Sequence, residues 1–209
     1  MSKLEIGKAN LEVFSETLID LAKKDKDIIV VTSDSRGSGK LVPFGEHLPG
    51  QIIEVGIAEQ NLVGIASGLA AAGKKVYAVS PGCFLSARAL EFIKNDVCYS
   101  DHPVNLIGIS SGVSYGALGS THHSLHDIAA LRAINNISIV APADNFETRE
   151  SIKLAAETQK PVYIRFGKRA MEHLHKPGTK FEFGKAITIC EGDDVGFIAT
   201  GETVVQALM

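Results

Sequence analysis

The chain has 209 residues, of which 45% are hydrophobic and 22% are charged, so it has the length for one sizeable core and the composition of a folded globular protein. Its net charge of −3, with both signs mixed along the chain, argues against binding to nucleic acid or to an anionic membrane. The sequence holds no apolar run long enough for a membrane span and no signal-peptide core, and its three cysteines lack metal-ligand spacing. These features predict a cytoplasmic protein with reduced thiols.

Short apolar runs alternate with longer amphipathic segments as far as residue 166. Continuous hydrophobicity within the short runs is typical of strands that are covered on both faces in a parallel sheet. The predicted strands are 27–31, 51–55, 75–79, 104–109, 137–141 and 161–166, and the predicted helices are 8–23, 58–72, 84–99, 125–134 and 146–159. This alternation predicts a doubly wound α/β fold, with about six mainly parallel strands and helices on both faces.

The pattern changes after residue 166. Residues 171–182 are polar and contain two histidines and Pro177, which predicts a linker. Residues 183–190 and 195–200 predict two more strands, and residues 203–209 predict the first turns of a helix. Because so small a unit cannot bury its own apolar face, we expect one domain over residues 1–170 and the incomplete start of a second α/β domain over residues 183–209.

The segment 52–61 places Glu59 in the first turn of a helix, after a strand and a tight glycine turn. Doubly wound sheets bind ligands at the carboxyl ends of their strands, where this turn lies. An acidic residue there can simply complement the helix dipole. The apolar neighbours of Glu59 favour a second role, because a carboxyl group among such side chains holds its proton more tightly and can share it with a ring nitrogen.

Two further segments follow predicted strands at the same edge of the sheet. Phe84 can form a platform for a flat ring, although an aromatic residue at that place is also typical of core packing. His122 and His123 lie in a loop before the predicted helix that contains His126, and the three lack the H-E-x-x-H spacing of a zinc site. Contacts with substrate hydroxyl or phosphate groups suit these histidines better, with surface residues of no specific role as the alternative.

Residues 108–112 match the G-x-S-x-G pattern of a hydrolase nucleophile, which makes Ser110 a candidate for a different class of enzyme. The nucleophile turn of hydrolases leads directly into a helix, whereas a glycine-rich loop follows here. Residues 35–40 lack the spacing of a phosphate-binding loop.

Taken in this order, these segments resemble the pyrimidine-binding domain of the transketolase superfamily over residues 8–170. The resemblance is carried by residues 32–34, 55–61, 82–85, 88–89, 119–123 and 141–144. Because Met1 lies close to the start of this domain, the chain resembles the C-terminal subunit of a split transketolase. The expected partner is an N-terminal subunit that carries the diphosphate-binding domain, in a dimer of heterodimers.

The resemblance implies thiamine diphosphate as cofactor, with Mg²⁺ held by the partner subunit and no metal ligand in this chain. It implies ketol transfer from a ketose to an aldose, with sugars or sugar phosphates as substrates. The implied catalytic residues are Glu59, which bonds the pyrimidine nitrogen, and His122. Cofactor binding is assigned to Asp34, Ile57, Glu59 and Phe84, and substrate binding to Ser38, Ser110, His122, His123 and Lys168.

Three positions depart from the pattern of many transketolases. Glu12 replaces an arginine, Ser110 replaces a histidine and Leu118 replaces an aspartate, each of them expected near the substrate. The alternatives are a deoxyxylulose-phosphate synthase, the beta subunit of a 2-oxo acid dehydrogenase, a Ser110 hydrolase and a non-catalytic regulatory subunit. The run 119–123 favours the transketolase over the dehydrogenase, and intact Glu59 and His122 argue against a non-catalytic subunit.

Overall fold

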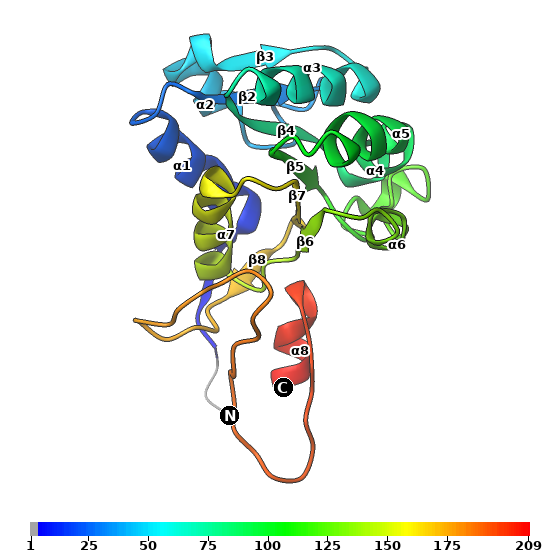
Figure 1. Ribbon diagram of the computed structural model, residues 1–209. Coiled ribbons are helices and arrows are strands. Elements are labelled where there is room, and N and C mark those ends of the chain that lie inside the picture. The colour runs from blue at the N-terminus through cyan, green and yellow to red at the C-terminus, as the bar shows by residue number, and fades with distance from the viewer. Residues whose placement is uncertain (1–3) are drawn as a thin grey trace.

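The computed structural model describes residues 4–209 and contains a six-stranded, all-parallel sheet between two layers of helices (Figure 1). The strand order is β3-β2-β4-β5-β7-β6. The strands are β2 (Ile28–Thr32), β3 (Ile52–Glu54), β4 (Lys75–Pro81), β5 (Val104–Ile109), β6 (Ser138–Val140) and β7 (Val162–Arg165). The six strands predicted up to residue 166 are therefore confirmed, as is their parallel direction.

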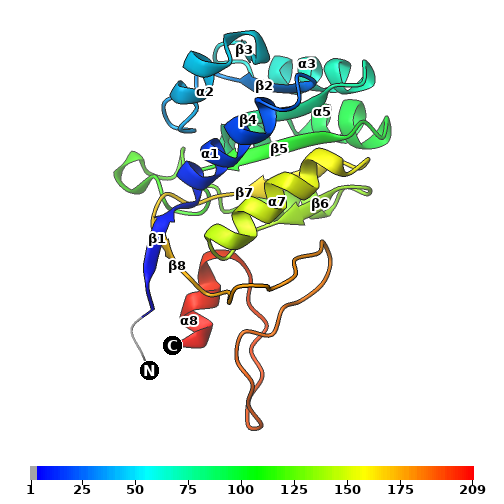
Figure 2. The same ribbon diagram turned by 90° about the vertical axis from the view of Figure 1, so that its left-hand side faces the viewer.

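Helices cover both faces of the sheet, which confirms the doubly wound fold. One layer contains α1 (Asn10–Ala22), α2 (Val42–His47) and α7 (Asn145–Glu157), of which α1 and α7 lie in front of the strands in Figure 2. The other contains α3 (Glu59–Ala71), α4 (Gly82–Arg88), α5 (Leu90–Phe92), the π-helical segment η2 (Ile93–Tyr99) and α6 (Asp127–Arg132).

Apolar spacing explains how these layers form. Leu11, Phe14 and Leu18 of α1 are three or four residues apart, and all three are buried on one side of the sheet. On the other side, Leu62, Ala66 and further α3 residues pack against the sheet. All six residues of β5 are buried, as expected of a strand covered on both faces.

Some elements differ from the prediction. The helix predicted over 84–99 begins two residues earlier and is divided into α4, α5 and η2. Residues 6–9 form β1 (Ile6–Ala9), which pairs antiparallel with β8 (Ala170–Glu172) at the start of the predicted linker. Helix α2 and the 3-10 turns η1 (Pro49–Gln51) and η3 (Gly116–Leu118) lie in segments expected to be loops.

The prediction of strands over 183–190 and 195–200 is wrong, because the structure has no strand anywhere in residues 183–200. An apolar run becomes a strand only where another strand is available for hydrogen bonding, and this loop runs away from the sheet (Figure 2). Val195, Phe197 and Ile198 are all exposed. The helix predicted near the end is confirmed as η4 (Gly201–Thr203) and α8 (Val204–Leu208).

No helix in residues 4–209 is long and apolar enough to cross a membrane.

Candidate functional site

Glu59 begins α3 at the carboxyl edge of the sheet, where its side chain is almost fully buried. The helix N-terminus favours a negative charge at this position. The Arg88 guanidinium, from the last turn of α4, donates from Nη1 to Glu59 Oε2 at 2.5 Å. The Arg88 side chain is 41% exposed, so a buried carboxylate is paired with a cation that solvent reaches.

Phe84, in the first turn of α4, connects this ion pair to the histidine loop. The guanidinium carbon of Arg88 lies over the Phe84 ring, 5.0 Å from its centroid. The His122 ring meets Phe84 edge to face at 5.2 Å and meets Tyr115 in the same way at 5.4 Å. Lys168 Nζ lies 3.9 Å from the centroid of Tyr115. These side chains thus form one continuous row.

An open pocket of about 410 Å³ lies beside Phe84 and Arg88. It is lined by Cys83, Phe84, Ala87, Arg88, Ser120, Thr121, His123 and His126. Glu59 is not among the lining residues, so Arg88 stands between its carboxylate and the pocket.

Backbone hydrogen bonds hold the histidine loop over the sheet. The N–H groups of Gly112 and Ser124 donate to each other's carbonyl oxygens, at 3.2 and 2.8 Å, and close the loop at its base. Gly119 has a φ of 77°, which side-chain-bearing residues rarely adopt, and its carbonyl accepts from the N–H of His122 at 3.0 Å. His123 Nε2 lies 3.1 Å from the carbonyl oxygen of Gly116.

Asp34 and Ile57 lie on the neighbouring loops after β2 and β3, and neither lines the pocket beside Phe84. Both loops are tied to Glu54 at the end of β3, which accepts from Asp34 N at 2.7 Å and from Gly56 N at 3.0 Å. Burial raises the pKa of Glu54, but these hydrogen bonds and one from Thr32 outweigh burial and lower it overall. Asp34 and Ile57 are exposed, Ile57 to 74%.

The remaining predicted substrate residues do not line the pocket beside Phe84. Ser38 Oγ donates to the carbonyl oxygen of Ser35 at 3.2 Å. Lys168 is exposed and lines a second cavity of about 600 Å³, together with Arg165 and Arg169. Ser110 is fully buried, with a φ of 58°, and its Oγ has no hydrogen-bond partner in residues 4–209. A serine nucleophile needs a base within hydrogen-bond reach, so this geometry gives no support to the hydrolase alternative.

Sequence reasoning missed the roles of three residues here. Arg88 enters the sequence pattern only as part of a motif, and nothing in its spacing indicates that it pairs with Glu59. Tyr115 and Glu54 carry no predicted role, although an acidic residue at the last position of a strand is a signal that was available for Glu54. Within residues 4–209, no group of three His, Cys, Asp or Glu side chains is arranged to hold a metal ion.

Comparison with known proteins assigns this chain to a family. Residues 7–173 match the family described as "Transketolase, pyrimidine binding domain". The chain is 50% identical over 196 residues to a subunit of the apulose-4-phosphate transketolase of Phocaeicola vulgatus, covering 93% of this chain and 62% of that protein. It is 39% identical over 197 residues to a putative transketolase C-terminal section of Methanocaldococcus jannaschii, again covering 93% of this chain and 62% of that protein.

A solved structure described as "Split gene transketolase, inactive beta4 tetramer" superimposes with a TM-score of 0.86 at 34% identity, covering 97% of this chain and 65% of that chain. The chain therefore spans less than two thirds of the length of these relatives. The family match covers most of residues 4–209, and the parallel sheet with Glu59 at its carboxyl edge lies inside it. The chain belongs to the family of transketolase pyrimidine-binding domains.

Proposed function

We propose that this chain supplies the pyrimidine half of a thiamine-diphosphate site in a two-subunit transketolase. The observation that carries the proposal is the buried carboxylate of Glu59 at the carboxyl edge of the sheet, beside the ring of Phe84 and the histidine loop. Membership of the transketolase family implies use of this cofactor. The names of the relatives, which describe a transketolase subunit and a C-terminal section, support a partner subunit.

The residues fit the pyrimidine end of the cofactor. A ring nitrogen needs a group that can share a proton with it, and the buried carboxyl group of Glu59 at the start of α3 is such a group. A flat ring stacks well on an aromatic side chain, and Phe84 is only half-buried. When bound, thiamine diphosphate would supply the nucleophilic carbon for transfer of a two-carbon ketol unit from a ketose to an aldose. In this chain, Glu59 would bond the pyrimidine nitrogen and hold the shared proton, while His122 and His123 would contact substrate hydroxyls.

A second subunit completes the site. The diphosphate of the cofactor needs a divalent cation with oxygen ligands, and we assign the Mg²⁺ ligands to an N-terminal subunit with a diphosphate-binding domain. Asp34 and Ile57 border the face that this subunit covers. The 74% exposure of Ile57 supports this, since a large apolar side chain so exposed is typical of an interface. Two such pairs make the proposed dimer of heterodimers.

The substrate is a sugar or sugar phosphate whose identity differs from that of ordinary pentose-phosphate transketolases. Glu12, at the position where many transketolases are expected to carry an arginine, lies 3.9 Å from Lys40. Leu118 is 55% exposed and cannot hydrogen-bond a hydroxyl group. Ser38 and Lys168 remain the proposed phosphate contacts, and Ser110, which is fully buried here, remains a predicted substrate contact. Apulose 4-phosphate is the first substrate to test, because it appears in the name of a relative that is 50% identical.

The test is reconstitution. The chain alone, the chain with the candidate N-terminal subunit, and that complex with Glu59→Gln are each supplied with Mg²⁺ and thiamine diphosphate, and ketol transfer is measured across a panel of ketose phosphates. We expect turnover only from the unmodified complex. Ketol transfer by the chain alone would contradict the two-subunit proposal, and a properly assembled complex that is inactive on every donor would contradict the transferase assignment.

A further inference from the structure

The guanidinium group of Arg88 contacts both groups that the cofactor needs, the Glu59 carboxylate and the Phe84 ring. Arg88 Nη1 lies 2.5 Å from Glu59 Oε2, and its central carbon lies 5.0 Å from the centroid of the Phe84 ring. The carboxylate is therefore paired, and one face of the aromatic ring is covered, by the same side chain. A flat ring that bonds Glu59 and stacks on that face of Phe84 needs the space that the guanidinium occupies.

A guanidinium group and an aminopyrimidine ring can make the same kinds of contact with Glu59 and Phe84. A guanidinium is planar, presents N–H groups along one edge and stacks on aromatic faces. An aminopyrimidine is also planar, bonds a carboxyl group through its ring edge and stacks on aromatic faces. Because an unpaired carboxylate that is almost fully buried is strongly unfavourable, Glu59 needs one of these partners at all times.

The exposure of the Arg88 side chain indicates which partner can be exchanged. Its side chain is 41% exposed and comes from the end of a seven-residue helix, so it can turn toward solvent without disturbing the core. Its Glu59 contact is the one hydrogen bond that Arg88 donates within residues 4–209. Release of the guanidinium therefore requires the loss of one ion pair and one ring contact.

We propose that Arg88 is a positioning residue that occupies the pyrimidine place in the cofactor-free protein, and that it must swing out before thiamine diphosphate binds. The arginine keeps the buried Glu59 carboxylate paired while the site is empty. It also lowers the apparent affinity for the cofactor, because only the fraction of molecules with Arg88 released is competent to bind. This inference rests on the proposed pyrimidine site at Glu59.

The experiment measures cofactor binding by calorimetry on the complex with the N-terminal subunit and Mg²⁺, independently of turnover. Arg88→Met keeps the length of the side chain but removes the charge and the N–H groups. We expect its Kd for thiamine diphosphate to be about tenfold lower than that of the unmodified complex, as for a protein in which roughly one molecule in ten is competent before the change. Arg132→Met, at the exposed end of α6, is the matched control and should leave the Kd unchanged.

A small-molecule substitute separates occupation of the site from a general effect on folding. In Arg88→Ala, a few millimolar methylguanidinium (roughly the scale of a weak single-site ligand) should bind the vacated place and raise the Kd for the cofactor again. The same concentration should leave the Kd of the unmodified complex unchanged. If Arg88→Met does not assemble, Arg88→Lys decides the question, since an ammonium pairs with Glu59 without covering the ring. Its Kd should be lower than that of the unmodified complex, but by less than the roughly tenfold change expected for Arg88→Met.

The outcomes distinguish this inference from the function on which it rests. A Kd in Arg88→Met that is unchanged or higher overturns the inference about Arg88, as does a lack of competition by methylguanidinium in Arg88→Ala. A Kd in Glu59→Gln equal to that of the unmodified complex overturns the pyrimidine site itself. If Glu59→Gln weakens binding while Arg88→Met does not strengthen it, the site stands and the displacement of Arg88 is wrong.

Discussion

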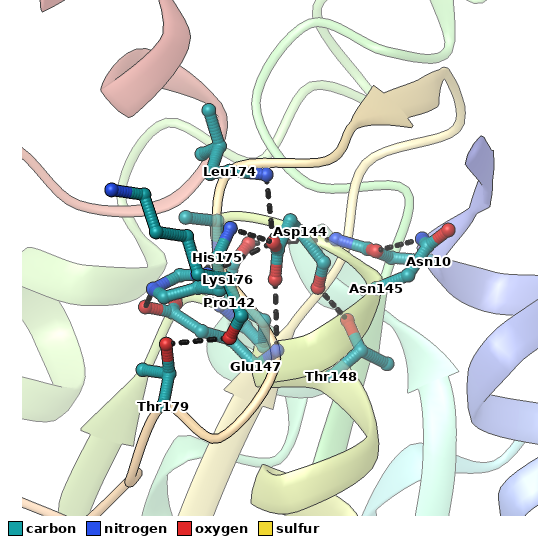
Figure 3. A network of polar contacts seen from close by, with 11 residues as sticks. Asn10, Pro142, Asp144, Asn145, Glu147, Thr148, Leu174, His175, Lys176 and Thr179 are labelled. Atoms are coloured by element: carbon teal, nitrogen blue, oxygen red, sulfur yellow. Dashed lines mark hydrogen bonds and ion pairs between the residues drawn. The ribbon is translucent and has the colours of Figure 1, made fainter. Parts of the chain in front are cut away.

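Among the buried carboxylates that lie at helix N-termini in residues 4–209, Glu59 and Asp144 are held in very different ways. Glu59, at the start of α3, is paired with one partly exposed arginine. Asp144, the N-cap of α7, accepts from the N–H of Glu147 at 2.9 Å and from the N–H of Leu174 at 3.1 Å (Figure 3). The N–H and Nδ1 of His175 complete its surroundings at 3.3 and 2.9 Å.

The difference separates a fixed carboxylate from an exchangeable one. Three of the groups around Asp144 are backbone N–H groups, which no ligand can displace without unfolding the segment. Its fourth partner, the His175 ring, is 1% exposed. The partner of Glu59 is a flexible side chain that reaches solvent. Equal burial of two carboxylates therefore does not imply equal roles, because it is the partner that determines whether a ligand can take its place.

The Asp144 cluster also attaches the segment after β8 to the domain. His175 and Leu174 lie within the predicted linker, residues 171–182, and they meet the start of α7 (Figure 3). Burial lowers the pKa of His175, but its hydrogen bond to Asp144 and the nearby Glu147 outweigh burial and raise it to about 9. Burial raises the pKa of Asp144, but His175 and the backbone hydrogen bonds lower it overall.

The largest expected effect is on the exchangeable carboxylate. Glu59→Gln keeps the shape of the side chain but cannot share a proton with a ring nitrogen, so turnover of the complex should fall about 10³-fold, within the range of lost general acid–base assistance. Exchange of the thiazolium proton, followed by NMR in the assembled complex, should fall in parallel. The thermal midpoint of the variant should stay near that of the unmodified protein. An unchanged exchange rate would show that Glu59 does not activate the cofactor.

The corresponding change at the fixed carboxylate should act on stability instead. Asp144→Ala removes a helix cap and leaves the buried His175 without its closest acceptor, so the free energy of unfolding should fall by about 3 kcal/mol. Urea denaturation measures this loss. Asp20→Ala, at an exposed place on α1, is the control and should have little effect. A stability loss no larger than that of the control would mean that the cluster contributes little.

The charge of His175 makes the stability of this region depend on pH. A histidine whose pKa is raised from 6.5 to about 9 on folding contributes stability that is complete below pH 6.5 and is lost as the pH rises through 9. His175→Phe should therefore cost roughly 2 kcal/mol near pH 6 and little near pH 9.5, with unfolding measured across that range. His173→Phe, at an exposed position two residues away, should show no such trend. Parallel pH profiles for His175→Phe and the unmodified protein would contradict the charged pairing.

The sequence predicted the fold better than the contacts of either carboxylate. Strand positions follow from short apolar runs, and Glu59 follows from its place between a strand and a helix. The pairing of Asp144 with His175 joins residues 31 positions apart, through a segment whose path no local pattern determines. No local pattern predicts the Glu59–Arg88 pair either, because it depends on how α3 and α4 pack together. The two strands wrongly predicted over 183–190 and 195–200 failed for a different reason. Their residues are apolar enough for strands, but no neighbouring strand is available to pair with them.

The smallest expected effect concerns the ring beside the exchangeable carboxylate. Phe84 is half-buried and contacts Arg88 on one face and the edge of His122, so it contributes less to the core than a fully buried phenylalanine does. Phe84→Ala should weaken binding of thiamine diphosphate to the complex by about 1 kcal/mol, the scale of one aromatic stacking contact. Phe84→Leu keeps the apolar volume but has no flat face, so it separates stacking from packing. If stacking matters, calorimetry should give both variants a similar loss of affinity, whereas wild-type affinity in Phe84→Leu would mean that the residue serves only to fill space.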